Sequence, residues 1–394
     1  MATPWPRATR PSVTQVNHFA SGLSRHPLAS HAVGETAGAV MEQLDGDDPD
    51  LVVCFASPHF VGAFDDLVPA LRELLNPRVL IGATAVSVIG NAEEVEEAPA
   101  FSLLAGSLPD AHLTPVTLDV QDTPDGPAIV GWPEIDETPP TLMLLAEPFS
   151  FPADAFLRRL DEDRPGLRVI GGVASAAMRP GGNRIVADGD VRAQGAVGVF
   201  LDGVDVRPVV SQGCRPIGQP FVVTAAHRNF IQELGGRQAL ERLRELADGL
   251  DEQDRALVQS GLHLGVVVDE HRTKFERGDF LIRNLVGADR ETGALAVGDQ
   301  IAVGQTVQFQ VRDAGAADED LRSLLAGAEA SAALVFTCNG RGRHLFGTPD
   351  HDAGVVAELL GPIPAAGAFC AGEIGPIGGR NFLHGFTASL ALFS

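Results

Sequence analysis

The sequence lacks long hydrophobic runs, paired cysteines and a signal peptide. Its longest apolar runs, such as residues 51–56 and 141–146, have the length of a strand and are too short to cross a membrane. The first ten residues are interrupted by proline and have no apolar stretch of the kind that directs export. The four cysteines, Cys54, Cys214, Cys338 and Cys370, form no CxxC pair. A zinc framework is therefore unsupported, and a reducing cytoplasm is the expected location.

Cationic residues are also scarce. The chain has 29 lysines and arginines against 52 aspartates and glutamates, which gives a formal net charge of -23. Such a chain repels phosphate backbones and anionic lipids, so neither nucleic acid nor a membrane surface is expected as a partner. The glycine loops contain neither GxGxxG after a strand nor GxxxxGK[ST], so no nucleotide cofactor is expected.

Three glycine-rich loops, residues 82–90, 171–179 and 367–375, share small residues in one register. Each loop is preceded by an apolar run and a helical pattern, and each is followed by another apolar run. The pattern predicts an α/β fold, in which repeated strand-helix-strand units form mixed sheets covered by helices. With 394 residues, two domains or one large repeated architecture is expected.

The region from about residue 211 to 330 has a different pattern. It predicts one helix at residues 239–247 and strands at 262–268, 280–286 and 305–312. The last strand alternates Val307, Phe309 and Val311, as a half-exposed strand would. The acidic stretch 93–97 is expected to be a solvated loop.

Polar residues that follow the apolar strands near the C-terminus are the candidates for binding chemistry. Asn339 and Arg341 follow one strand, and the planar fork of Arg341 matches a carboxylate. Glu373 stands in a long uncharged run, so a buried carboxylate there needs a partner, either Arg341, Arg380 or the ammonium group of a ligand. The alternative is a plain hairpin connection with an exposed acid.

Covalent chemistry is a further alternative. Cys370 could be a nucleophile with His384 or His351 as base and Glu373 as the orienting acid, but a pocket-lining thiol is favoured. Asp350 or Asp352 is expected to cap the helix that follows, and no metal site is expected.

The chain resembles the FIST family of ligand-binding sensory modules. The resemblance lies in four groups of segments: residues 335–342 with His351-Asp352, 369–376 and 381–387, 280–285 and 309–313, and 213–218. It implies an N-terminal tail at residues 1–20, a FIST N-terminal domain at 21–210 and a FIST C-terminal domain at 211–394. It also implies a sensor of small molecules, with amino acids among the proposed ligands.

Together these observations predict a stand-alone cytoplasmic protein that binds an amino acid or a similar small polar carboxylate metabolite. An unidentified signalling partner protein is a further expectation. The alternatives are a small-molecule enzyme that uses Cys370 or a Glu373/His384 acid-base pair, and a protein-interaction scaffold. The expected ligand-binding residues are Asn339, Arg341, Cys370, Glu373, Arg380, Asn381 and His384.

Overall fold

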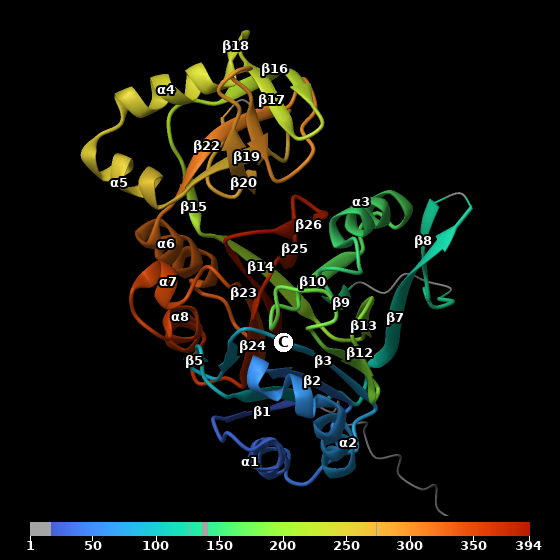
Figure 1. The fold of residues 1–394 in the computed structure, drawn as a ribbon. Coiled ribbons are helices and arrows are strands. Elements are labelled where there is room, and N and C mark those ends of the chain that lie inside the picture. Colours follow the sequence, from blue (N-terminus) through green and yellow to red (C-terminus); the bar gives the residue numbers. More distant parts are fainter. Residues whose placement is uncertain (1–16, 125, 136–140, 273) are drawn as a thin grey trace, which may run out of the picture.

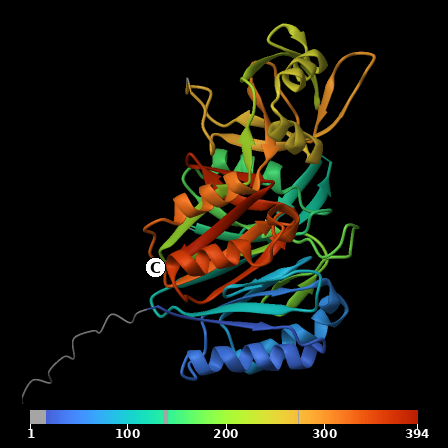
Figure 2. The ribbon, with the colours of Figure 1, turned by 90° about the vertical axis from the view of Figure 1, so that its left-hand side faces the viewer.

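The computed structural model describes residues 17–124, 126–135, 141–272 and 274–394. Three mixed sheets make up the larger part of the molecule, which we call the body, and a fourth sheet closes into a barrel (Figure 1). The barrel lies at one end of the molecule, and α1 (Ala29–Gln43) and α2 (Phe64–Leu75) lie at the other (Figure 2). Most of the predicted tail, residues 1–20, falls outside the described residues, although β1 already begins at His18.

The three body sheets contain six or seven strands each, named below in spatial order. The first sheet contains β1 (His18–Ser24), β6 (Phe101–Ser107), β2 (Leu51–Ala56), β3 (Val79–Thr84), β11 (Ile185–Ala187) and β12 (Asp190–Arg192). The second contains β26 (Arg380–His384), β25 (Glu373–Ile377), β10 (Arg168–Val173), β9 (Thr141–Ala146), β13 (Ala196–Asp202), β7 (His112–Thr123) and β8 (Gly126–Val130). The third contains β14 (Val206–Gln212), β27 (Thr387–Phe393), β23 (Ala332–Cys338), β24 (Ala365–Cys370), β4 (Val88–Gly90) and β5 (Glu93–Val95).

One parallel pair lies at the centre of each sheet: β2–β3, β9–β10 and β23–β24. The helices that join them are α2, α3 (Ala153–Asp163) and α8 (His351–Leu360). Their apolar residues recur at helical spacing, so each helix presents a stripe that covers the sheet, as the sequence predicts. The α/β class is therefore confirmed. The body also contains α6 (Ala314–Leu325), the short α7 (Arg343–Phe346) and the 3-10 helix η1 (Pro58–Ala63).

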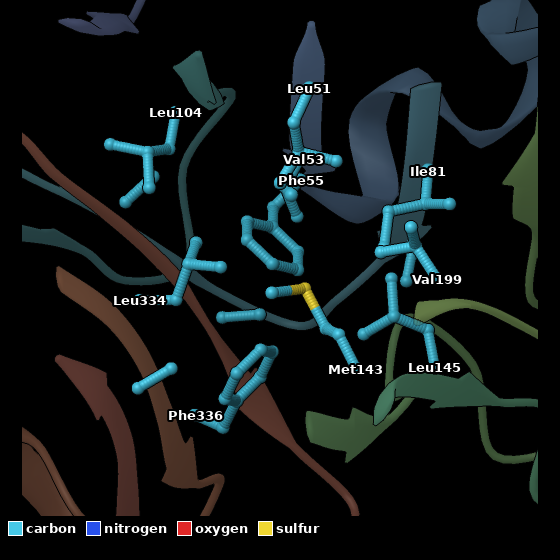
Figure 3. Close-up of a cluster of buried hydrophobic side chains, with 14 of the residues drawn as sticks. Leu51, Val53, Phe55, Ile81, Leu104, Met143, Leu145, Val199, Leu334 and Phe336 are labelled. Carbon is cyan, nitrogen blue, oxygen red and sulfur yellow. The ribbon is translucent and has the colours of Figure 1, made fainter. Parts of the chain in front are cut away.

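The inner faces of the three sheets meet in one central core (Figure 3). Phe55 from β2, Met143 from β9 and Phe336 from β23 converge there, and the rings of Phe55 and Phe336 meet edge to face at 6.0 Å. Because helices cover the outer faces, the central strands are buried on both sides. This double burial explains why their sequences are continuously apolar rather than alternating.

Short hairpins link the three sheets. The β4–β5 hairpin follows β3 of the first sheet but pairs with β24 of the third. In the same way β11–β12 follows β10 and pairs with β3, and β25–β26 follows β24 and pairs with β10. Each sheet therefore has at one edge a hairpin that follows a strand of another sheet, and this strand pairing holds the body together.

The barrel strands run in the order β15 (Cys214–Pro216), β22 (Thr306–Arg312), β16 (Phe221–His227), β17 (Phe230–Leu234), β21 (Leu295–Val297), β20 (Phe280–Ala288) and β19 (Leu262–Val267). The barrel closes because β19 also pairs with β22, while β18 (Arg237–Gln238) pairs with β17. Helices α4 (Ala239–Gly249) and α5 (Glu252–Ser260) pack beside it. The predicted helix and the three predicted strands of this region are confirmed.

The expectation that residues 305–312 form a half-exposed strand is wrong. Val307, Phe309 and Val311 point into the barrel as predicted, but Gln308 and Gln310 on the other face are buried as well. Gln308 Nε2 donates to the carbonyl of Gly218, just after β15, and Phe386 of the body packs on His263, which is paired with Gln310. Alternation in the sequence could not show this second burial. Within the described ranges, no helix is long and apolar enough to cross a membrane.

Candidate functional site

The predicted site residues surround the place where the body meets the barrel. Cys370 ends β24, Glu373 begins β25 and His384 ends β26. All three side chains are buried. Asn339, which follows β23, is exposed instead.

Arg341 is fully buried and forms a bidentate ion pair with Asp352, in which Nε and Nη2 each donate a 2.7 Å hydrogen bond. Burial alone would raise the pKa of Asp352, but the Arg341 guanidinium and its hydrogen bonds outweigh burial and hold that pKa below its usual range. Two of the three guanidinium nitrogens of Arg341 therefore donate to a carboxylate of the protein itself. The hypothesis that its fork binds the carboxylate of a ligand is not supported by this geometry.

Neither expected aspartate caps α8 with its side chain. Asp350 occupies the N-cap position but accepts a hydrogen bond from the backbone N–H of Glu94, and Asp352 binds Arg341. The cap comes from Glu94, whose Oε1 accepts from the backbone N–H groups of Asp352 and Ala353. The expectation of a solvated acidic loop is therefore wrong for Glu94. Burial and the neighbouring Asp352 raise its pKa to about 8.

Glu373 lies beside the thiols of Cys338 and Cys370 and forms no ion pair among the described residues, although the nearby Arg341 guanidinium acts to lower its pKa. Its Oε2 accepts hydrogen bonds from the hydroxyl and backbone N–H of Thr387, at 2.7 and 3.2 Å. Burial raises the pKa of Glu373 to about 8, although the two Thr387 bonds oppose the shift. Burial also raises the pKa of Cys338 to about 12 and that of Cys370 well above its ordinary value. These thiols are therefore poor nucleophiles.

His384 and Glu373 occupy paired positions on β26 and β25, but each binds elsewhere. The His384 Nε2–H donates to the Gly375 carbonyl at 2.9 Å, and burial lowers the pKa of this histidine to about 4. The acid-base alternative gains no support from these contacts. Asn381 binds Asp161 and the backbone of Leu167 and Val169, so its side chain anchors β26 to α3 and β10.

A cleft opens between the body and the barrel, with a volume of about 740 Å³. Its body wall comes from α3 and β26 and includes Asp154, Arg158 and Arg380, and its barrel wall includes Arg228 and Arg283. An adjoining cavity of about 320 Å³ shares Asp154, Arg283 and Asp299 and reaches His384 and Phe386. Of the predicted residues, only Arg380 and His384 line either cavity.

Arg283 connects the two walls of this cleft. Its Nε lies 2.6 Å from Asp299 on the barrel, and its Nη1 donates to the Leu383 carbonyl on the body at 3.1 Å. Asp154 of α3 lies 3.8 Å from its Nη2. The side chain therefore fixes the barrel against the body and leaves little charge for a ligand.

Two other arginines keep their charge available. Arg228 lies at the turn between β16 and β17, and its guanidinium has no ionic or hydrogen-bonding partner in the described part of the chain. Arg380 on the opposite wall is 57% exposed, and its nearest acid, Asp161, is 4.0 Å away. Sequence reasoning missed Arg228, and only its position in a hairpin turn could have suggested that it is presented at a surface.

Comparison with known families agrees with the resemblance. The FIST N domain matches residues 50–237, and the FIST C domain matches residues 239–376. The chain belongs to the FIST family. An uncharacterized protein of Mycobacterium bovis is 45% identical over 379 residues, which span 94% of this chain and 97% of that protein. An uncharacterized protein of Mycobacterium tuberculosis is 46% identical over 379 residues, spanning 94% of this chain and 98% of that protein.

FIST domains are associated with sensory binding of small ligands. Residues of both matched regions line the cleft, since Asp154, Arg158 and Arg228 belong to the FIST N match and Arg283 and Asp299 to the FIST C match. A junction between two regions is a common place for a ligand pocket. The names of the two relatives state no ligand, so the ligand must be argued from the site itself.

Proposed function

We propose that this FIST protein senses an amino acid or a similar small carboxylate metabolite, which it binds in the cleft between body and barrel. The observation that carries the proposal is the pair of available guanidinium groups, Arg228 and Arg380, on opposite walls of one cavity. In a chain of net charge -23, such a local concentration of positive charge attracts a small anion out of solution. A cavity of about 740 Å³ is of the size that small metabolites occupy.

Acidic groups in the same cleft suit the ammonium group of an amino acid. Asp154 and Asp299 line both cavities and share Arg283 as an ionic partner, and Asp154 also forms an ion pair with Arg158 on its own helix. A zwitterion can therefore find complementary charges a short distance apart. This assignment moves the predicted carboxylate partner from Arg341 to the cleft arginines, while the predicted class of ligand is retained.

Thermal melting in a panel of amino acids and small carboxylates tests the proposal. A ligand at one hundred times its dissociation constant should stabilise the fold by about 2.7 kcal/mol. Replacing both arginines, Arg228→Gln with Arg380→Gln, should weaken binding at least tenfold, because two charge-assisted hydrogen bonds are lost. The matched control is Arg159→Gln, an exposed arginine of α3 that does not line the cleft. A panel in which nothing stabilises the folded protein would contradict the proposal.

The proposal includes four further statements. The three strand-helix-strand units are taken as copies of one ancestral unit, and the domain division near residue 210 is kept as predicted. The protein is placed in the cytoplasm, and its liganded state is read by a partner protein. Capture of a partner that depends on the stabilising metabolite would support the sensory role, whereas capture independent of it would favour the scaffold alternative.

A further inference from the structure

The turn between β26 and β27 holds a bulky side chain in an unusual backbone conformation. Phe386 has φ +62°, a region that side chains larger than asparagine rarely adopt. Its ring lies 4.2 Å from the His263 ring, and the Arg312 guanidinium lies over it at 5.1 Å. Its backbone carbonyl accepts a hydrogen bond from Gly213. The strain at Phe386 is thus held by contacts with the barrel.

Several buried hydrogen-bond donors near this turn have no acceptor among the described residues. Gln310 Nε2, Arg312 Nε and Arg341 Nη1 are buried and have no hydrogen-bond partner among the described residues. Gln310 and Arg341 are each 1% exposed. On β22, Gln310 is paired with His263 of β19, and Arg312 is paired with Cys214 of β15. Arg341 Nη1 lies beside Gly213. An unsatisfied buried donor is costly, so three of them in one place need an explanation.

Glycines let the backbone come close to these donors. A Cβ at Gly213 would lie 2.4 Å from the Phe386 carbonyl oxygen and 3.1 Å from Arg341 Nη1, so only glycine fits there. A Cβ at Gly340 would lie 3.5 Å from Arg312 and 3.6 Å from the Phe386 ring. The adjoining cavity of about 320 Å³ reaches Phe386 from the other side. The ring therefore stands between an open cavity and a group of donors.

We propose that Phe386 is a gate over an oxyanion-binding subsite whose donors come from Gln310, Arg312 and Arg341. When the turn rearranges so that residue 386 leaves its positive φ and the ring moves away, a carboxylate or phosphate oxygen can accept from these three groups. The His263 ring nitrogens and Glu373 Oε1 are also buried without partners among the described residues, but two of the three donors are guanidinium groups, so the subsite favours an anion over a cation. The inference rests on the proposed function in that the adjoining cavity is taken as part of the ligand cleft.

Titration with sodium acetate and with sodium phosphate, followed by calorimetry, tests the gate and distinguishes the two kinds of oxyanion. Sodium chloride at matched ionic strength corrects for screening. The variant Phe386→Gly opens the subsite and relieves the positive φ, so affinity for one of the two anions should rise at least tenfold. A rise is expected because a closed gate leaves only a small fraction of the protein able to bind the anion, which lowers the apparent affinity by that fraction. Adding Arg312→Gln in the Phe386→Gly protein should abolish that gain.

The matched control is Glu97→Gly, which relieves a similar φ of +55° in the body, just after β5. This variant should bind both anions as the unaltered protein does. Equal affinity in all variants would overturn the gate and assign the buried donors to internal water. Acetate and phosphate can also bind the cleft arginines, so both titrations are repeated in the Arg228→Gln, Arg380→Gln protein. A gain from Phe386→Gly that persists there belongs to the gate, so the gate and the proposed function can fail separately.

A second measurement needs no substitution. Cys214 is buried in the small apolar cluster against which Phe386 packs, so an open gate should expose its thiol. Alkylation by N-ethylmaleimide, located by peptide mass spectrometry, should be at least several-fold faster at Cys214 when the tighter of the two anions is present. Cys54, which is fully buried in the first sheet, is the internal reference and should not change. An anion that leaves the Cys214 rate unchanged would contradict the gate.

Discussion

Two buried regions of this protein differ in their chemistry. The central core, where the three body sheets meet, consists almost entirely of apolar side chains in close contact. The junction between body and barrel is equally buried at Arg341, Glu373 and Gln310, but each of these residues keeps one polar atom without a partner in the described structure. A region that existed only for stability would have apolar residues at such positions. We infer that the core holds the fold together, and on the proposed function the junction keeps its polarity for binding.

The largest effect is expected in the central core. Phe336→Ala should lower the free energy of unfolding by about 4 kcal/mol, because it removes the ring that packs on Phe55 and leaves a cavity between three sheets. Urea denaturation measures the loss. Leu324→Ala on the exposed side of α6 is the control and should change stability by less than about 0.5 kcal/mol. A comparable loss in both variants would show that the core is not the main source of stability.

The next effect concerns the buried ion pair beside the junction. Asp352→Ala should destabilise the fold by about 3 kcal/mol, because the fully buried Arg341 loses its counterion. Asp318→Ala removes a half-exposed acid that contacts His351 and Arg322, and it should cost less than about 1 kcal/mol. Equal losses of stability in urea denaturation would show that burial does not determine how much the Arg341–Asp352 pair contributes to stability.

Glu373 should make stability depend on pH. Its pKa is raised from 4.5 to about 8 by burial, so the folded protein holds the proton more tightly than the unfolded chain does. The resulting stabilisation is complete below pH 4.5 and is lost as the pH rises through 8. Glu373→Gln keeps the size and removes the titration.

The measurement is the difference in urea midpoint between the unaltered protein and Glu373→Gln, taken at about pH 5 and about pH 8.5, on either side of most of the titration. The advantage of the unaltered protein should shrink between the two values. Glu94 titrates near the same pH in both proteins, so its contribution cancels in the difference. Parallel pH profiles would mean that Glu373 is ionised in the folded protein.

The smallest effect on stability is expected at Gln310. Gln310→Met keeps the volume and removes a buried donor that has no acceptor within the described residues, so stability should stay within about 1 kcal/mol or rise. The same substitution should weaken oxyanion binding in the Phe386→Gly protein by at least severalfold. A clear loss of stability without any loss of binding would make the polarity of the junction structural.

Much of the fold was predictable because local patterns determine it. The apolar strands Leu51–Ala56 and Thr141–Ala146, and the helical spacing of Phe64, Leu67 and Leu71, identify the α/β class without any tertiary information. Burial of Glu94 was missed because its partner backbone, the start of α8, lies 258 positions away. Hydrogen bonds over such a separation leave no local pattern.

The candidate site was predicted less completely. The C-terminal loops do lie at the junction, yet Arg341 and Asn381 bind protein groups, and the cleft arginine Arg228 was not considered. The choice between a ligand and a protein partner for an arginine depends on which acid reaches it. Asp352 lies only 11 positions from Arg341, but as a cap candidate it was assigned a different role.

The sequence by itself determined the class of fold, the helices and strands of the central units, and membership of the FIST family. Only the tertiary structure decided which polar residues are satisfied, because the exchanged hairpins and the closing barrel bring together groups that are far apart in the chain. Periodicity records which face of an element is apolar. It does not record what covers the other face, and for Gln310 and Phe386 that covering surface is the reason to expect a ligand.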